Sequence, residues 1–226
     1  MVQRPLDESV EFAENPEPRA PCVLLLDVSG SMDGEPIEEL NAGLKEFKAA
    51  IAKDPIASKR VEVAIITFSD EADLVHDFAT IDNFYPPQLT ASGSTAMGIG
   101  ILQALQAIRE RKETYRRNGV MYFRPWLFLI TDGQPTDSEE IIIQAKTALN
   151  DEERRKGVIF FPIGVEGANM EFLAQLSSER RPMKLKGLNF REFFMWLSAS
   201  MQRVSTSRPG EKLNLPDASG WGEISV

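Results

Sequence analysis

The fold is indicated first by Val23–Ser31, which reads VLLLDVSGS. Its four leading apolar residues, Val23–Leu26, predict a strand that is buried on both faces of a sheet. Asp27, Ser29 and Ser31 then follow this strand at its carboxyl end, the edge where ligands bind in open α/β sheets. Because their side chains offer only oxygen, they predict a site for a hard divalent cation. Mg²⁺ is the first candidate, with Mn²⁺ or Ca²⁺ as alternatives.

Beyond this stretch, apolar strands alternate with amphipathic helices. The further strands are expected at 61–68, 74–78, 126–131, 158–165 and 183–185. Helices are expected at 36–53, 96–117, 138–153, 170–176 and 189–204. This alternation predicts an α/β fold with a doubly wound, mainly parallel six-stranded sheet and helices on both faces. The more polar segment 74–78 is expected to be an antiparallel edge strand, and Pro162 is expected to limit pairing on one side of its strand.

The two ends of the chain differ from the middle. Residues 1–20 are acidic and contain prolines, which predicts an arm that lies over the domain. The single domain is expected over residues 21–204. Residues 205–226 are rich in Ser, Pro and Gly and predict a tail. Trp196 lies off the apolar stripe of the last helix, so we expect it to be partly exposed and to contact this tail.

Composition restricts the function. The 226 residues include 34 acidic and 25 basic ones, a formal net charge of −9. This balance argues against nucleic acid and against an anionic membrane surface as partners. No secretory signal and no membrane span is recognisable, and the one cysteine, Cys22, allows no intrachain disulfide, so we expect a cytoplasmic protein. The only histidine is His76, which leaves little material for a zinc site or a catalytic triad.

Two further segments end in oxygen ligands. Thr95 follows a glycine-containing loop and precedes a helix, and Asp132 follows the strand at 126–131. Each of these signals has a simpler explanation, because Asp, Ser and Thr often serve only as helix caps or turn residues. Their combination is more specific, since three separate segments bring oxygen atoms to one edge. We therefore predict a metal site formed by Asp27, Ser29, Ser31, Thr95 and Asp132.

These motifs resemble the metal-ion-dependent adhesion site of von Willebrand factor type A domains over about residues 20–204. Within that family the chain looks like the bacterial TerY-like branch, named for tellurium resistance. The matching stretches are 21–37, 89–95, 124–136 and 193–200. The resemblance implies a Rossmann-like fold. It also implies that Mg²⁺, held by the five residues, binds a Glu or Asp carboxylate of a protein partner. It further implies bacterial stress signalling together with a protein kinase and a PP2C-type phosphatase.

Two rival functions remain open at this point. The first is an adaptor for an ATP-driven chaperone or chelatase, a use known for other proteins with this domain. The second is a phosphotransferase with Asp27 as nucleophile. That chemistry commonly needs a second aspartate two residues on, where this chain has Ser29, and no phosphate-binding Gly-x-x-x-x-Gly-Lys motif is present. We therefore expect no enzyme activity.

The surroundings of the predicted metal site lead to two more expectations. Thr95, Pro135 and Met32 should form the rim of a partner interface. Alternatively, the arm or the tail could close the site with a carboxylate of its own, for which Glu14, Asp217 and Glu223 are the candidates.

Overall fold

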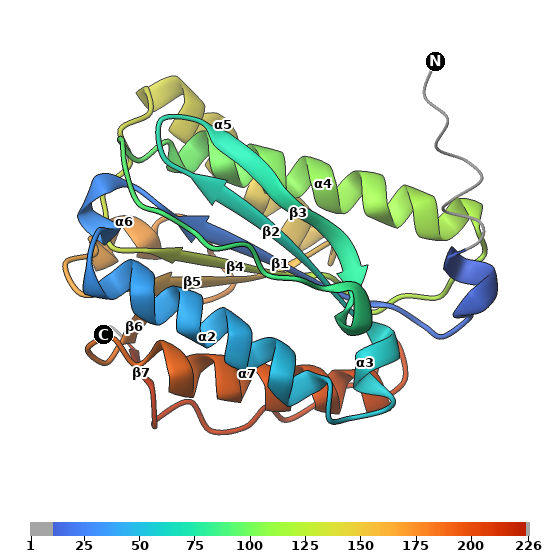
Figure 1. Ribbon diagram of the computed structural model, residues 1–226. Coiled ribbons are helices and arrows are strands. Elements are labelled where there is room, and N and C mark those ends of the chain that lie inside the picture. The colour runs from blue at the N-terminus through green and yellow to red at the C-terminus, as the bar shows by residue number, and fades with distance from the viewer. Residues whose placement is uncertain (1–10, 225–226) are drawn as a thin grey trace, which may run out of the picture.

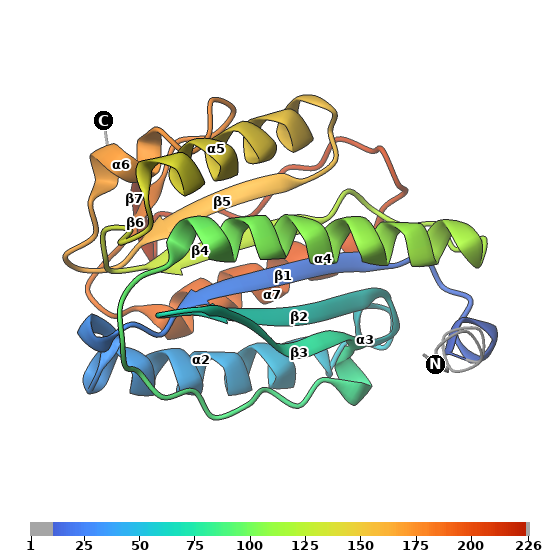
Figure 2. The same ribbon diagram turned by 90° about the horizontal axis from the view of Figure 1, so that it is seen from above.

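One sheet of seven strands forms the centre of the molecule, in the order β3-β2-β1-β4-β5-β6-β7 (Figures 1 and 2). The computed structural model describes residues 11–224. The strands are β1 (Ala20–Asp27), β2 (Val61–Phe68), β3 (Ala72–Thr80), β4 (Trp126–Thr131), β5 (Ile159–Gly164), β6 (Met183–Leu185) and β7 (Gly222–Ile224). The five inner strands are parallel, while β3 and β7 pair antiparallel at the two edges. The predicted doubly wound α/β fold with an antiparallel edge strand is confirmed.

The sheet has one strand more than the six that the sequence predicts. The additional strand, β7, comes from the segment expected to be a plain tail. It pairs with β6 over only three residues, Gly222 to Ile224. Three residues are too few to show the alternation by which strands are recognised. Trp221, which is 2% exposed, fixes this end of the chain against the core.

Helices cover both faces of the sheet. In Figure 1, α2 (Glu35–Ile51) and α7 (Phe190–Thr206) lie on one face, and α4 (Met97–Arg117) and α5 (Glu139–Arg154) lie on the other. The shorter elements are α3 (Ala57–Arg60), α6 (Met170–Ala174) and the 3₁₀ turns η1 (Gly30–Met32) and η2 (Ile81–Asn83). Alternate residues of β1 enter two separate cores. Leu24 and Leu26 pack on the α2 and α7 side, and Val23 and Leu25 pack on the α4 and α5 side. An uninterrupted apolar strand is therefore required at this position.

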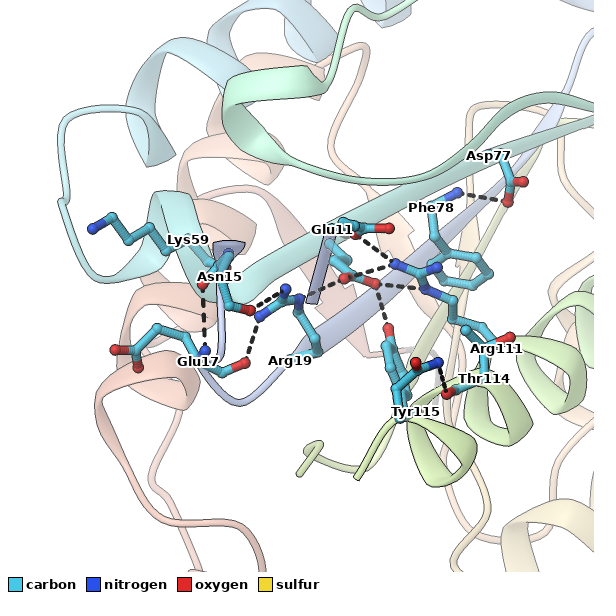
Figure 3. Close-up of polar contacts among 12 residues, drawn as sticks. Glu11, Asn15, Glu17, Arg19, Lys59, Asp77, Phe78, Arg111, Thr114 and Tyr115 are labelled. Carbon is cyan, nitrogen blue, oxygen red and sulfur yellow. Dashed lines mark hydrogen bonds and ion pairs between the residues drawn. The ribbon is translucent and has the colours of Figure 1, made fainter. Parts of the chain in front are cut away.

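A buried ion cluster joins the N-terminal segment to the sheet (Figure 3). Glu62 on β2 accepts hydrogen bonds from Arg19 Nε at 2.7 Å, from Arg111 Nε at 2.9 Å and from the Tyr115 hydroxyl. Glu11 accepts from the same Arg111 at 3.0 Å. Arg19 and Glu62 lie at the starts of β1 and β2, so the cluster occupies the end of the sheet opposite the carboxyl ends of these strands.

Some expectations concern chain ends that the structure describes only in part. Residues 1–10, including Pro5 and the segment examined for a secretory signal, lie outside the described residues, as do 225 and 226. Within residues 11–224, no helix combines the length and the hydropathy that a membrane-spanning segment needs. Trp196 contacts the tail as expected, since its Nε1 donates to the carbonyl of Pro216 at 2.9 Å. It is only 8% exposed, less than expected, because Trp221 packs against it.

Candidate metal centre

The five predicted ligand residues lie together at the carboxyl ends of two neighbouring strands. Asp27 is the last residue of β1, and Asp132 follows the last residue of β4. Because β1 and β4 pair in parallel, both carboxyl groups reach the same edge of the sheet. Ser29 and Ser31 lie in the turn after β1, and Thr95 directly precedes the cap of α4.

Short distances connect the members of this group. Ser31 Oγ donates to Asp132 Oδ1 at 2.7 Å and lies 3.1 Å from Ser29 Oγ. The backbone N–H of Ser29 donates to Asp27 Oδ1 at 2.9 Å. The turn after β1 therefore folds back on itself, so that its two hydroxyls face the carboxyl groups of Asp27 and Asp132.

Gly133 allows Thr95 to approach Asp27. A Cβ atom at Gly133 would lie 3.2 Å from Thr95 Oγ1 and 3.5 Å from Asp27 Oδ2. A Cβ atom at this position would therefore press on the Thr95 side chain, which a glycine after Asp132 avoids, and would be in ordinary contact with Asp27. The backbone of Thr95 is held from the same loop, because its N–H donates to Thr136 Oγ1 at 3.0 Å and its carbonyl accepts from the Thr136 N–H at 2.9 Å.

Two residues that the sequence reasoning did not select also build the site. The Thr131 hydroxyl donates to Asp27 Oδ2 at 2.5 Å and so fixes the orientation of that carboxyl group. Asp70 Oδ1 accepts from the N–H and the hydroxyl of Ser94, at 2.8 and 2.7 Å, which holds the loop before Thr95. The preceding Gly93 has a φ of 81°, a left-handed conformation that favours glycine. Asp70 follows the end of β2 by two residues, so the strand-end rule that selects Asp27 and Asp132 could have found it as well.

Burial dominates the electrostatics of the two carboxyl groups. Asp27 is fully buried, and burial raises its pKa, although hydrogen bonds from Ser29 and Thr131 oppose the shift. The nearby charge of Asp132 raises the pKa of Asp27 further. Burial also raises the pKa of Asp132, which is partly offset by the hydrogen bond from Ser31. Over residues 11–224, neither carboxyl group forms an ion pair with a lysine or arginine.

This donor set fits a hard divalent cation. Two carboxyl groups held close together without a basic partner lack the positive charge that would stabilise their ionised forms. No group of three or more His, Cys, Asp or Glu side chains suited to a metal exists among the described residues, so hydroxyls must complete any ligand set here. Carboxylate and hydroxyl oxygens are ligands of the type that Mg²⁺ accepts.

Two expectations about the surroundings are wrong. Met32 does not form part of an exposed rim, because it is 0% exposed and belongs to the core under α2 and α7. Closure of the site by one of the three candidate carboxylates, all of which lie within residues 11–224, is not seen either. Glu14 lies in the segment bound near the opposite end of the sheet, and Asp217 binds Ser219. Glu223 lies on β7, which is three strands away from β4.

Comparisons with known proteins agree with this geometry. A family model, the von Willebrand factor type A domain, matches residues 22–193, a span that includes all five residues. The collagen alpha-6(VI) chain of Homo sapiens is 27% identical over 167 residues, which are 71% of this chain and 7% of the collagen chain. The Mus musculus collagen alpha-6(VI) chain is 26% identical over the same length. The chain thus spans a small fraction of the length of these curated relatives.

Solved structures also share the fold. The PilB minor pilin from Streptococcus sanguinis has a TM-score of 0.59 at 14% identity, over 83% of this chain and 62% of the pilin. The conserved hypothetical protein BatB from Bacteroides thetaiotaomicron has a TM-score of 0.54 at 16% identity, over 83% of this chain and 100% of BatB. At these identities the likeness concerns the fold alone.

Proposed function

The chain belongs to the von Willebrand factor type A domain family, and on that premise we propose that it is a divalent-metal-dependent protein-interaction module. Domains of this family are generally interaction or adhesion modules and are often metal-dependent. The observation that carries the proposal is the meeting of Asp27, Asp132 and three hydroxyls at one sheet edge, with no basic side chain paired to either carboxyl group.

In this proposal Asp27, Ser29, Ser31, Thr95 and Asp132 hold the ion, directly or through water. The bound ion, Mg²⁺ first and Mn²⁺ or Ca²⁺ as alternatives, supplies positive charge and an open coordination position. Thr131 and the backbone N–H of Ser29 orient Asp27, and Asp70 and Thr136 hold the loop that carries Thr95. When these residues, or the waters they hold, fill five positions, an octahedral ion is one ligand short, and an Asp or Glu of a protein partner completes it.

The surroundings of the site narrow the type of partner. The segments at this edge, residues 28–36, 69–72, 92–99, 132–140 and 165–171, contain ten acidic residues and no lysine, arginine or histidine. The remainder of the chain holds 24 acidic and 25 basic residues and is close to neutral. A partner that brings a carboxylate to this face meets repulsion unless basic groups surround that carboxylate. We therefore propose a partner whose ligating Asp or Glu lies within a basic patch.

Metal binding is tested by calorimetry with Mg²⁺ and Mn²⁺. We expect weak binding by the wild type and none by the Asp27→Asn, Asp132→Asn double variant. Asp33→Asn is the matched control, because Asp33 is exposed on the same edge and is not among the five residues. Equal affinity of the wild type and the double variant would contradict the proposed ligand set.

Partner binding is tested by co-purification from the native host in Mg²⁺ and again in chelator. A partner of the metal face is retained in Mg²⁺, released by chelation and lost in Asp27→Asn, while Asp33→Asn retains it. A partner that remains bound in chelator would show that another surface docks it, even if calorimetry detects the metal.

The narrower assignment rests on the sequence resemblance. We propose that the domain acts in a TerY-like, tellurium-resistance type of stress signalling in the bacterial cytoplasm, with a kinase and a PP2C-type phosphatase. An adaptor role for an ATP-driven chaperone or chelatase is the alternative, and recovery of an ATPase as the metal-dependent partner would favour it. We propose no catalysis. Turnover of a generic phosphate ester that disappears in Asp27→Asn would overturn this part.

A further inference from the structure

The outer edge of β5 is left partly open by a proline. β4 pairs with β5 along its whole length, from Ile159 to Gly164. On the other side, β6 pairs only with Ile163 and Gly164. Pro162 lies directly before this short pairing, and proline has no N–H to donate to a neighbouring strand. β6 therefore does not pair with β5 at Phe161 and Pro162, and both residues line a cavity beside this edge.

A cavity of about 300 Å³ lies at this edge. It is lined by Phe161, Pro162, Ile163, Arg180, Arg181, Met183, Trp196 and Leu215. These residues come from four parts of the chain: β5, β6 with the residues just before it, α7 and the tail. All of these residues are apolar except the two arginines, so any polar recognition by side chains in the cavity depends on Arg180 and Arg181.

The walls of the cavity are held in place by contacts outside it. Phe161 stacks on Phe128 with ring centroids 4.5 Å apart and an interplanar angle of 6°. Trp196 is fixed by its hydrogen bond to the Pro216 carbonyl and by Trp221, whose ring centroid lies 5.1 Å away. Because the indole N–H of Trp196 is already used, this wall presents an apolar surface to a ligand. A cavity with walls held in this way is preformed, which lowers the entropic cost of binding.

The arginines at the cavity carry charge without an ion-pair partner. The guanidinium carbon of Arg180 lies 4.5 Å from the centroid of the Phe161 ring, which holds the group over the apolar floor. Neither Arg180 nor Arg181 forms an ion pair with any acidic group among residues 11–224. Burial against the protein lowers the pKa of Arg180, although Glu153 and Glu179 oppose the shift. Arg180 and Arg181 are both exposed and bring two positive charges to the cavity.

We propose that this cavity binds a small amphipathic carboxylate, with its apolar body against Trp196, Met183 and Leu215 and its carboxylate on Arg180 and Arg181. A planar guanidinium matches a carboxylate in geometry and charge. The volume is near the lower end of the range for small-molecule sites, so a short or medium chain fits and a long-chain lipid does not. The cavity shares no residue with the metal centre, and the inference stands apart from the proposed function.

Octanoate is the probe, and calorimetry on the full chain is the measurement. We expect one octanoate per chain below its micellar concentration, with octanol and octylammonium bound at least tenfold more weakly. Arg180→Met keeps the apolar stem and removes the charge, so it should weaken octanoate binding at least tenfold. Arg155→Met is the matched control, because Arg155 is an exposed arginine on another surface and should bind octanoate like the wild type.

Two further variants locate the site. Leu215→Trp fills the cavity from the tail and should abolish binding, with unfolding followed in urea to show that the variant stays folded. Asp27→Asn should bind octanoate like the wild type, which separates this cavity from the metal centre. Octanol bound as tightly as octanoate, or unchanged affinity in Arg180→Met, would overturn the proposal. Binding that survives Leu215→Trp in a folded protein would also overturn it.

Discussion

At the scale of single residues, Asp27 shows a conflict between burial and charge. Its carboxyl group is fully buried at the end of β1 and lies beside the acidic Asp132. Hydrogen bonds from Ser29 and Thr131 favour its ionised form, yet its pKa is raised, so burial outweighs them. The ionised Asp27 therefore lowers the free energy of unfolding of the metal-free protein. A bound cation would reverse this loss, because it neutralises the carboxylate.

We predict that Asp27→Asn stabilises the metal-free protein at pH 7. The variant removes a buried charge but keeps a side chain of the same shape, so the free energy of unfolding should rise by about 1 kcal/mol. In Mg²⁺ the order should reverse. The wild type gains about 2.7 kcal/mol at a hundred times its Kd, and the variant gains nothing. Urea unfolding in chelator and in Mg²⁺ measures both effects, with Asp33→Asn as control. A variant less stable than the wild type in chelator would contradict this account.

The same two carboxyl groups predict how metal binding depends on pH. Both have a pKa above the ordinary 3.8, so protons compete with the metal at a higher pH than for an exposed carboxyl group. Metal affinity should fall as the pH is lowered from 7 toward 5. The stability of the metal-free protein should change in the opposite direction and increase as the pH is lowered. Its folded state binds protons more tightly than the unfolded state, so its stability contribution from Asp27 and Asp132 rises as the pH falls through the raised pKa values. Calorimetry at several pH values checks the first effect, and a flat profile down to pH 4.5 would contradict it.

At the scale of elements, the buried ion cluster links the N-terminal segment, β2 and α4. Glu62 accepts from two arginines and from Tyr115, and both Arg19 and Glu62 are 0% exposed. Phe12 lies against the same arginines, with ring centroid distances of 5.2 and 5.1 Å to their guanidinium carbons. Residues 11–19 of the arm are thus part of the folded structure at the end of the sheet opposite the metal centre.

We predict unequal costs for two substitutions in this cluster. Glu62→Gln leaves Arg19 without a neutralising charge and leaves Arg111 with Glu11 as its remaining acidic partner, so it should cost about 3–5 kcal/mol of unfolding free energy. Tyr115→Phe removes one hydrogen-bond donor while the three ion pairs of the cluster remain, and should cost about 1–2 kcal/mol. Denaturant unfolding of the two variants gives the comparison. If Tyr115→Phe were as damaging as Glu62→Gln, the hydroxyl and not the ion pairs would hold the cluster together.

At the scale of the whole molecule, the net negative charge of the chain comes almost entirely from the segments at one edge of the sheet. The loops at the carboxyl ends of β1, β2, β4 and β5, with the segment before α4, contain ten acidic residues and no basic ones. The field from these residues attracts basic surfaces and repels acidic ones, and salt screens it.

This distribution predicts which peptides bind in Mg²⁺. A peptide with one central Glu between lysines should bind more tightly than the same peptide with Gln, which lacks the ligand for the metal. A peptide with Glu between acidic residues should bind most weakly. The affinity of the basic peptide should fall as salt is raised from 50 to 300 mM, and the double variant Glu139→Gln, Glu140→Gln should reduce that dependence. NMR titration gives the affinities, and equal binding of the basic and acidic peptides would contradict the prediction.

The sequence by itself determined the α/β fold and the convergence of the candidate site. Apolar runs such as Val23–Leu26 between turn signals indicate buried strands, and parallel strands bring the residues after them to one edge. The order of residues along the chain therefore placed Asp27 and Asp132 together without knowledge of any contact. Local sequence was sufficient because Asp27 ends one strand and Asp132 directly follows another.

The tertiary structure alone decided the contacts that depend on packing between distant segments. It buried Met32, which local reasoning had placed on the surface, because η1 turns this side chain under α2 and α7. It made a seventh strand from three residues of the tail, which are stable there only because β6 offers an edge. It also assembled the Glu62 cluster and the cavity beside Pro162 from segments far apart in the chain. No local pattern encodes such partners, since their energy comes from burial and from charges that meet only after folding.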